Sequence, residues 1–222
     1  MNTVTDKYII FDTETTGLGR SKDGVKTEPY IVQLSWVLWD NKLKRIENIG
    51  DRIIKIPEEV EIEEGSLKVH GITKNDTQEK GVPIEIALEE FDFDLNKAKM
   101  MVAHNIDFDK RMVIGEYKRN KKFNYKLSKL PAFCTMTMGT NLCNLKYTNR
   151  QGKEKRKSPK LKELYKHLFD SGVDESKLHN ALVDVIVAWR CFCKMHLKYD
   201  MISDEDPENL YEGLRKYYKS LL

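Results

Sequence analysis

Two carboxylates stand two residues apart in Phe11-Asp12-Thr13-Glu14-Thr15-Thr16-Gly17, directly after an apolar run that ends at Phe11. If this run is a strand, its side chains alternate, so Asp12 and Glu14 share one face and Thr13 points away. Neighbouring carboxylates repel unless a cation lies between them, and hard divalent cations prefer oxygen ligands. The spacing therefore indicates a metal site. A solvated pair at a strand end is the open alternative.

A second acidic stretch is Ala103-His104-Asn105-Ile106-Asp107-Phe108-Asp109. It leads from a short apolar strand into the start of a helix, a frequent place for ligands in α/β sheets. Asp107 and Asp109 are about 200° apart on a helix, so only one of them can share a site with Asp12. The ordinary alternative is that acidic residues favour the first turn of any helix.

The third stretch, Leu178-His179-Asn180-Ala181-Leu182-Val183-Asp184, opens the most apolar helical pattern in the chain. Asp184 interrupts that pattern, and a carboxylate there is costly to bury unless it is paired or bound to a metal. On a continuous helix His179 would lie about 140° away from Asp184. We therefore expect His179 in the loop that enters the helix, where it either reaches the site or serves as a capping or packing residue.

Together these segments resemble the DEDD-type (DnaQ-like) 3′→5′ exonucleases of the histidine subclass. The matching motifs are F-D-T-E-T-T-G-L at 11–18, H-N-x-x-F-D at 104–109 and H-x-A-x-x-D at 179–184. The segment V-H-G-I-T at 69–73 is also common in that family. The resemblance extends from about Tyr8 to Met195, nearly the whole chain.

The resemblance implies an α/β, ribonuclease H-like three-layer fold with a five-stranded mixed sheet flanked by helices. It also implies two divalent cations, Mg²⁺ or Mn²⁺, and release of nucleoside 5′-monophosphates from a 3′ end. It assigns the metal-binding catalytic carboxylates to Asp12, Glu14, Asp109 and Asp184, the general base to His179, and substrate binding to Thr15, Leu18, His104 and Asn105, with Leu18 against the terminal base. The chain departs from many relatives at Cys134-Thr135, where they have Asp-Thr, and in its long 19–29 segment.

Patterning along the chain agrees with a mixed α/β sheet, because three strands precede an alternation of helices and strands. We expect strands at 7–11, 30–39, 43–56, 100–103 and 130–137, the last running into a helical turn, and helices at 61–69, 83–96, 105–119 (with Asn105 as N-cap), 161–169, 177–199 and 207–222. We expect the segments 17–29 and 147–160 to be loops.

Composition places limits on the class of protein. The chain has 222 residues, of which 40% are hydrophobic, and a net charge of +3. No apolar run reaches the roughly 18 residues that a membrane helix needs, and no secretory signal is visible. The four cysteines form no C-x-x-C pairs, which gives a structural zinc site little support. We expect a soluble, intracellular exonuclease domain over 1–200, a C-terminal helical extension over 201–222, and no membrane partner.

The substrate is indicated by two basic clusters. They comprise Lys118, Arg119, Lys121, Lys122 and Lys126, and then Lys146, Arg150, Lys153, Lys155, Arg156 and Lys157 around Tyr147. Such clusters track the backbone of single-stranded nucleic acid, or else are solvated surface. We favour the 3′ ends of DNA over RNA because the first motif is typical of proofreading relatives, and a polymerase or replication partner is compatible with this.

Two other classes of function remain open. A strand-transfer enzyme of the DDE type on the same fold would not need His179. A non-catalytic binding module would have lost at least one of the four acidic residues, and none is missing.

Overall fold

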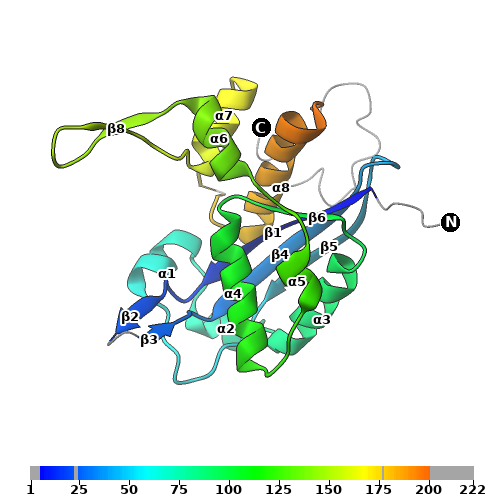
Figure 1. Ribbon diagram of the computed structural model, residues 1–222. Coiled ribbons are helices and arrows are strands. Elements are labelled where there is room, and N and C mark those ends of the chain that lie inside the picture. The colour runs from blue at the N-terminus through cyan, green and yellow to red at the C-terminus, as the bar shows by residue number, and fades with distance from the viewer. Residues whose placement is uncertain (1–5, 23–24, 177, 201–222) are drawn as a thin grey trace.

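A five-stranded mixed sheet forms the centre of the protein in the computed structural model, which describes residues 6–22, 25–176 and 178–200 (Figure 1). The strand order is β5-β4-β1-β6-β7. The pairs β5/β4 and β4/β1 are antiparallel, whereas β1/β6 and β6/β7 are parallel. The strands are β1 (Lys7–Thr15), β4 (Ile31–Asp40), β5 (Arg45–Ile53), β6 (Met100–Ala103) and β7 (Ala132–Cys134). The predicted α/β class and mixed sheet are confirmed.

Helices connect these strands and cover both faces of the sheet. They are α1 (Glu64–His70), α2 (Lys74–Glu79), α3 (Ile84–Leu95), α4 (Ile106–Arg119), α5 (Tyr125–Lys129), α6 (Thr135–Cys143), α7 (Leu161–Phe169) and α8 (Ala181–Phe192), followed by a π-helical turn (Cys193–Leu197). No helix in the described ranges is long and apolar enough to cross a membrane.

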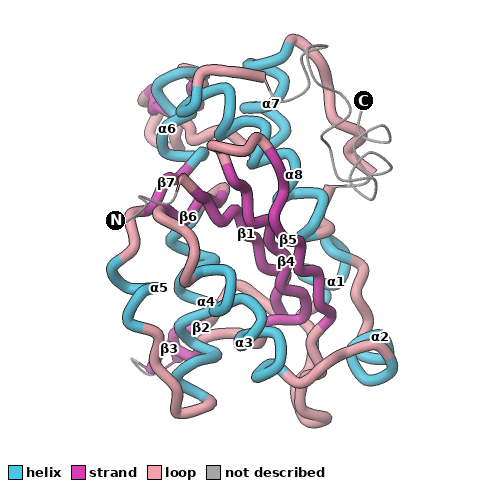
Figure 2. The backbone as a smooth tube through the Cα atoms, turned by 90° about the vertical axis from the view of Figure 1, so that its right-hand side faces the viewer, coloured by secondary structure: helices cyan, strands magenta, loops and turns pink. Residues whose placement is uncertain are grey.

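The alternation of side chains along β1 divides the core into two layers. Tyr8 and Ile10 pack in a cluster with residues of α7 and α8, whereas Ile9 and Phe11 pack with residues of α3 and α4. Figure 2 shows the strands between these two sets of helices. The predicted three-layer arrangement is confirmed. It also determines which face each later residue of β1 occupies, because even-numbered residues face α8 and odd-numbered residues face α4.

The apolar helix α8 lies directly on the sheet. The ring centroids of Trp39 on β4 and Trp189 on α8 are 4.9 Å apart, and Tyr8 meets Phe192 at 5.0 Å. Every residue of β4 is buried, because the strand lies between two others and under helices on both faces. The start of α8 is therefore held firmly against the sheet beside the end of β1.

Both segments predicted as loops contain a small hairpin. The first holds β2 (Arg20–Lys22) and β3 (Val25–Thr27), and the second holds β8 (Lys146–Thr148) and β9 (Glu154–Arg156). The prediction was wrong because elements of only a few residues are too short to show a regular apolar period. The short helices α2 and α5 went unpredicted for the same reason.

Several helix boundaries also differ from the prediction. The helix expected at 177–199 begins only at Ala181, because Asn180 caps it by accepting hydrogen bonds from two backbone N–H groups, and it ends in the π-helical turn. Asn105 precedes α4 as predicted, but its side chain makes no capping hydrogen bond, since its backbone is left-handed (φ 72°). The predicted extension at 201–222 and its helix lie outside the described residues.

Candidate metal centre

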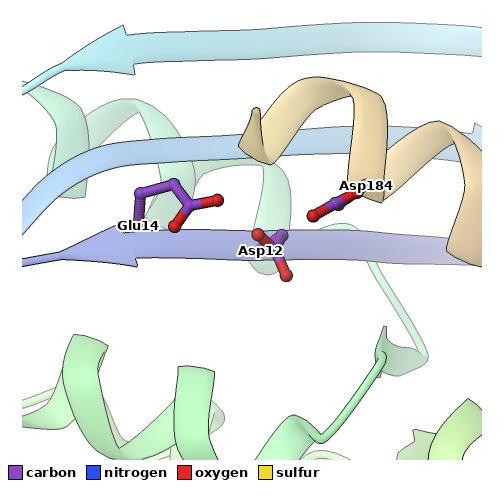
Figure 3. A group of neighbouring side chains, drawn as sticks. All are labelled: Asp12, Glu14 and Asp184. Atoms are coloured by element: carbon purple, nitrogen blue, oxygen red, sulfur yellow. The ribbon is translucent and has the colours of Figure 1, made fainter. Parts of the chain in front are cut away.

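Three carboxylates converge at the end of β1. Asp12 and Glu14 lie on the face of β1 that meets α8, as the predicted alternation requires, and Asp184 comes from the first turn of α8 (Figure 3). One carboxylate oxygen from each of the three lies within 4.8 Å of the others. All three residues are half-buried. The cluster therefore offers convergent hard oxygen donors at a partly open position.

The start of α8 is fixed to the sheet by a polar residue that sequence reasoning missed. Gln33 on β4 is 2% exposed, and its Oε1 accepts a hydrogen bond from Ala181 N at 3.1 Å. Its Nε2 donates to Asp51 Oδ1 on β5 at 2.8 Å. Gln33 thus joins two strands to the helix that carries Asp184. The available signal was a glutamine inside the apolar run Tyr30-Ile31-Val32-Gln33-Leu34.

Asp109 approaches from the other helix layer. It is 2% exposed, and its Oδ1 accepts hydrogen bonds from Thr13 N at 3.0 Å and Thr13 Oγ1 at 2.8 Å. Thr13 can donate its N–H because β6 pairs with β1 only as far as Ile10. Asp107 is exposed, so only one of the two acidic residues approaches the site, as predicted.

Burial raises the pKa values of all four carboxyls, and for Asp12, Glu14 and Asp109 repulsion by neighbouring carboxylates adds to it. For Asp12, burial acts first and is reinforced by Asp109, Asp184 and Glu14, so its pKa rises well above the usual range. Burial, then Asp184 and Asp109, raise the pKa of Glu14 to about 8. Burial raises the pKa of Asp109 to about 7 against the opposing Thr13 hydrogen bonds. It raises the pKa of Asp184 to about 7 against the opposing His179 N–H.

The donor set fits a divalent cation. Asp184 Oδ1 is buried without a hydrogen-bond partner among the residues that the structure describes. The carboxylates of Asp12 and Glu14 accept no hydrogen bond from other described residues either. No Lys or Arg among the described residues pairs with these acids, so ionising the cluster alone is costly, and a bound cation would remove that cost.

His179 lies in the loop before α8, which confirms its predicted location. Its backbone is left-handed (φ 68°), and its N–H donates to Asp184 Oδ2 at 3.3 Å. The residue is exposed, and partial burial together with Lys160 and Lys162 lowers the pKa of its imidazole. The ring is therefore neutral at physiological pH and can accept a proton.

The segment V-H-G-I-T fastens α1 to the end of β1. Ile72 N donates to His70 Nδ1 at 3.0 Å, so Nε2 carries the ring hydrogen and donates to Thr15 O at 3.2 Å. Glu63, the residue before α1, donates its N–H to Thr16 O at 2.8 Å, which also holds this helix against the end of β1.

The four predicted substrate-binding residues fall into two groups. Leu18 is 75% exposed and, with Val69 and Phe108, lines a cavity of about 320 Å³ beside Glu14. Asn105 is also exposed. By contrast, Thr15 is buried, and its hydroxyl donates to Gly17 O at 2.6 Å.

His104 has protein partners at both ring nitrogens. Nε2 lies 3.1 Å from Pro159 O, a group that can only accept, so Nε2 carries the hydrogen. Nδ1 then accepts from Thr135 Oγ1 at 2.9 Å. Burial lowers the pKa of His104 to about 4, which keeps this neutral form. Its ring joins β6, the start of α6 and the segment before α7, a contact between residues far apart in sequence.

The first predicted basic cluster lies at the far end of α4, about 15 Å along the helix from Asp109. Arg119 pairs with Glu116 and donates to the carbonyl oxygens of Glu28 and Pro29. Lys122 pairs with Glu89, and Lys126 donates to Asn96 O. Three of its cations thus have partners within the protein.

Comparisons with known proteins identify the family and the fold. The family model described as exonuclease matches residues 9–192. Escherichia coli exonuclease I, solved with a dT13 oligonucleotide, superposes with a TM-score of 0.64 at 15% identity over 87% of this chain and 42% of that one. Its zinc-bound complex with single-stranded DNA gives 0.64 at 15%, over 86% and 40%. Cell-death related nuclease 4 gives 0.64 at 14%, over 89% and 66%. A search of curated proteins found no match. This chain spans about two fifths of the length of exonuclease I.

Proposed function

Because this chain belongs to the exonuclease family, we propose that it is a metal-dependent 3′→5′ exonuclease that hydrolyses DNA to nucleoside 5′-monophosphates. The observation that carries the proposal is the convergence of Asp12, Glu14 and Asp184, with donor oxygens within 4.8 Å and a buried oxygen of Asp184 that has no other partner.

Each carboxylate has a role that follows from its contacts. Asp12, Glu14 and Asp184 would hold the cations directly, because their oxygens face one another. Asp109 contributes its remaining oxygen, since Thr13 occupies Oδ1 twice. Two divalent cations, when bound, would stabilise the charge on the attacking and leaving oxygens of an in-line phosphoryl displacement.

The other residues position the substrate and deprotonate the attacking water. His179 is neutral and exposed beside Asp184, so its imidazole takes the proton of the attacking water. Leu18 and its apolar neighbours Val69 and Phe108 hold the terminal base in the cavity beside Glu14. DNA is the proposed substrate, since the exonuclease I complexes contain DNA oligonucleotides. An RNA substrate is the alternative, and a polymerase partner stays a prediction.

Single-stranded DNA and RNA labelled at the 5′ end, incubated with Mg²⁺, with Mn²⁺ and with a chelator, would test the proposal. Shortening of the labelled DNA one nucleotide at a time, only with metal, is the expected result. Immediate release of the labelled nucleotide would refute the 3′→5′ direction. Faster degradation of RNA than of DNA would show that RNA is the preferred substrate.

Variants of neighbouring residues test the assignment of the site. Asp12→Asn should lower the turnover rate by at least about 10²–10³-fold, because charge stabilisation at the reacting phosphate is lost. Asp107→Asn is the matched control, since it removes an exposed carboxylate two residues from Asp109 and should leave the rate unchanged. Full activity in Asp12→Asn would overturn the site.

A further inference from the structure

The hairpin β8–β9 projects from the body of the protein next to α6 and α7 (Figure 1). All six residues of its two strands are exposed, so the hairpin makes no contribution to the core. The segment 145–157 carries six Lys or Arg residues and only one acidic residue, Glu154. A projecting ribbon of this charge is a candidate surface for a polyanion.

The hairpin is a defined structure rather than an irregular loop. Asn149 Oδ1 accepts hydrogen bonds from Gln151 N at 3.0 Å and Lys153 N at 2.9 Å. Asn149 N donates to Lys153 O at 2.9 Å, and Gly152 takes the left-handed conformation (φ 75°) that closes the turn. Each side chain of the hairpin therefore lies on a defined face of it.

On one face of the hairpin β8–β9, called the ribbon below, the charged side chains have partners within the protein. The register pairs Lys146 with Arg156 and Thr148 with Glu154, so these four side chains share a face. Lys146 Nζ lies 2.6 Å from Glu154 Oε2, and Arg156 donates to Asn141 Oδ1 on α6. The cations of this face already have partners.

The opposite side carries cations without partners and one aromatic ring. Tyr147 pairs with Lys155, and Lys153 follows on the same side by alternation. Tyr147 is 49% exposed. Within the described part of the chain, none of these three side chains makes a hydrogen bond or ion pair. An aromatic ring beside two such cations is the arrangement on which bases stack while phosphates are neutralised.

The root of the ribbon is tied to the candidate metal centre. After β9 the chain reaches Pro159, whose carbonyl oxygen accepts the hydrogen bond from His104 Nε2 at 3.1 Å. His104 lies two residues before α4, the helix of Asp109. The chain then enters α7, whose Leu164 and Tyr165 pack in one cluster with residues of α8, the helix of Asp184. The ribbon therefore begins beside the site.

We propose that the face formed by Tyr147, Lys153 and Lys155 binds single-stranded nucleic acid on the 5′ side of the nucleotides held at the metal centre. Tyr147 stacks on an unpaired base, and the two lysines contact phosphates. The side chain of Tyr147 favours a single strand over a duplex, since the faces of paired bases are covered by their neighbours. This inference rests on the proposed exonuclease function, which places the 3′ end at Asp12.

The test measures binding without catalysis. Fluorescence anisotropy in EDTA would compare oligo-dT of about 20 nucleotides with oligo-dT of about 4, which leaves far less strand for the ribbon once its 3′ end is at Asp12. Tyr147→Ala should weaken binding of the longer strand about 5- to 150-fold, and Tyr147→Phe should restore it. The pair Lys153→Ser/Lys155→Ser should reduce the log–log salt slope by about 1.4, or ~0.7 per contact.

The matched control is Lys146→Ser/Arg156→Ser, which removes the same charge from the opposite face. Its effect should be clearly smaller. Equal losses from both faces, an unchanged salt slope, or equal loss in Tyr147→Ala for a blunt duplex would overturn the proposal.

Cleavage of the short strand separates this inference from the function on which it rests. If the short strand is cleaved in Mg²⁺ but the variants of the two faces bind equally, the proposal for the ribbon is refuted and the exonuclease function is not. Face-specific binding without cleavage supports the ribbon as a binding surface and refutes the exonuclease.

Discussion

The acidic cluster should reduce the stability of the metal-free protein, and Asp184 is the best position at which to measure this. The pKa of Asp184 is raised from 3.8 to about 7. Above pH 7 the folded protein therefore holds an ionised group that the unfolded chain ionises at lower cost. At 1.36 kcal/mol per pKa unit the penalty at pH 8 is about 4 kcal/mol.

Replacing Asp184 by asparagine removes the charge and keeps the shape. The new side-chain oxygen can still accept the hydrogen bond from His179 N. An amide N–H left unpaired costs about 1–3 kcal/mol, so the net gain in unfolding free energy at pH 8 should be about 1–3 kcal/mol. For a chain of this length that raises Tm by roughly 2–12 °C.

The sign of the pH dependence provides the control. A carboxyl with a raised folded-state pKa costs nothing below the unfolded value of 3.8, and its cost grows as pH rises to about 7. The advantage of Asp184→Asn should therefore fall by more than half between pH 8 and pH 5.

Thermal unfolding in EDTA at both pH values would measure this, and Mg²⁺ should stabilise the wild type more than the variant. A variant less stable than wild type at pH 8, or a difference independent of pH, would refute the reasoning.

Two further predictions concern the groups around the cluster. His179→Ala should lower the turnover rate by ~10²–10⁴-fold, and this defect should become smaller as pH rises. Calorimetric titration should show that the variant still binds metal. A large loss of metal binding would instead make His179 a metal ligand. Thr13→Val removes the hydrogen bond from the Thr13 hydroxyl to Asp109 Oδ1 and should lower activity by about 5- to 15-fold in a steady-state assay. Thr13→Ser keeps the hydroxyl and should keep the activity. Equal activity in both variants would show that the backbone N–H alone positions Asp109.

Local periodicity predicted how the carboxylates of the candidate site are arranged, whereas the family resemblance selected the four residues. Alternation along a strand placed Asp12 and Glu14 on one face, and the helical angle allowed only one of Asp107 and Asp109 to approach. The mismatch between His179 and Asp184 on a continuous helix correctly placed His179 in the entering loop. Each of these inferences uses residues within a few positions of one another.

The residues that hold the carboxylates in place could not be predicted in the same way. Thr13 contacts a residue 96 positions away, and Gln33 contacts one 148 positions away. His104 matches a family motif, which predicts contact with substrate, yet Thr135 and Pro159 occupy its ring. Such contacts depend on how strands and helices assemble, so sequence alone showed only that a polar residue interrupts an apolar run.

The four acidic residues differ in how many hydrogen bonds their carboxylate oxygens accept. Asp109 accepts twice at one oxygen, and Asp184 accepts once at a long 3.3 Å. The carboxylates of Asp12 and Glu14 accept none from the described residues. The elements that carry the acids are instead anchored by bonds elsewhere, such as Gln33 to the start of α8. Repulsion among the acids is therefore resisted by the scaffold, which leaves most of their oxygens for a ligand to neutralise.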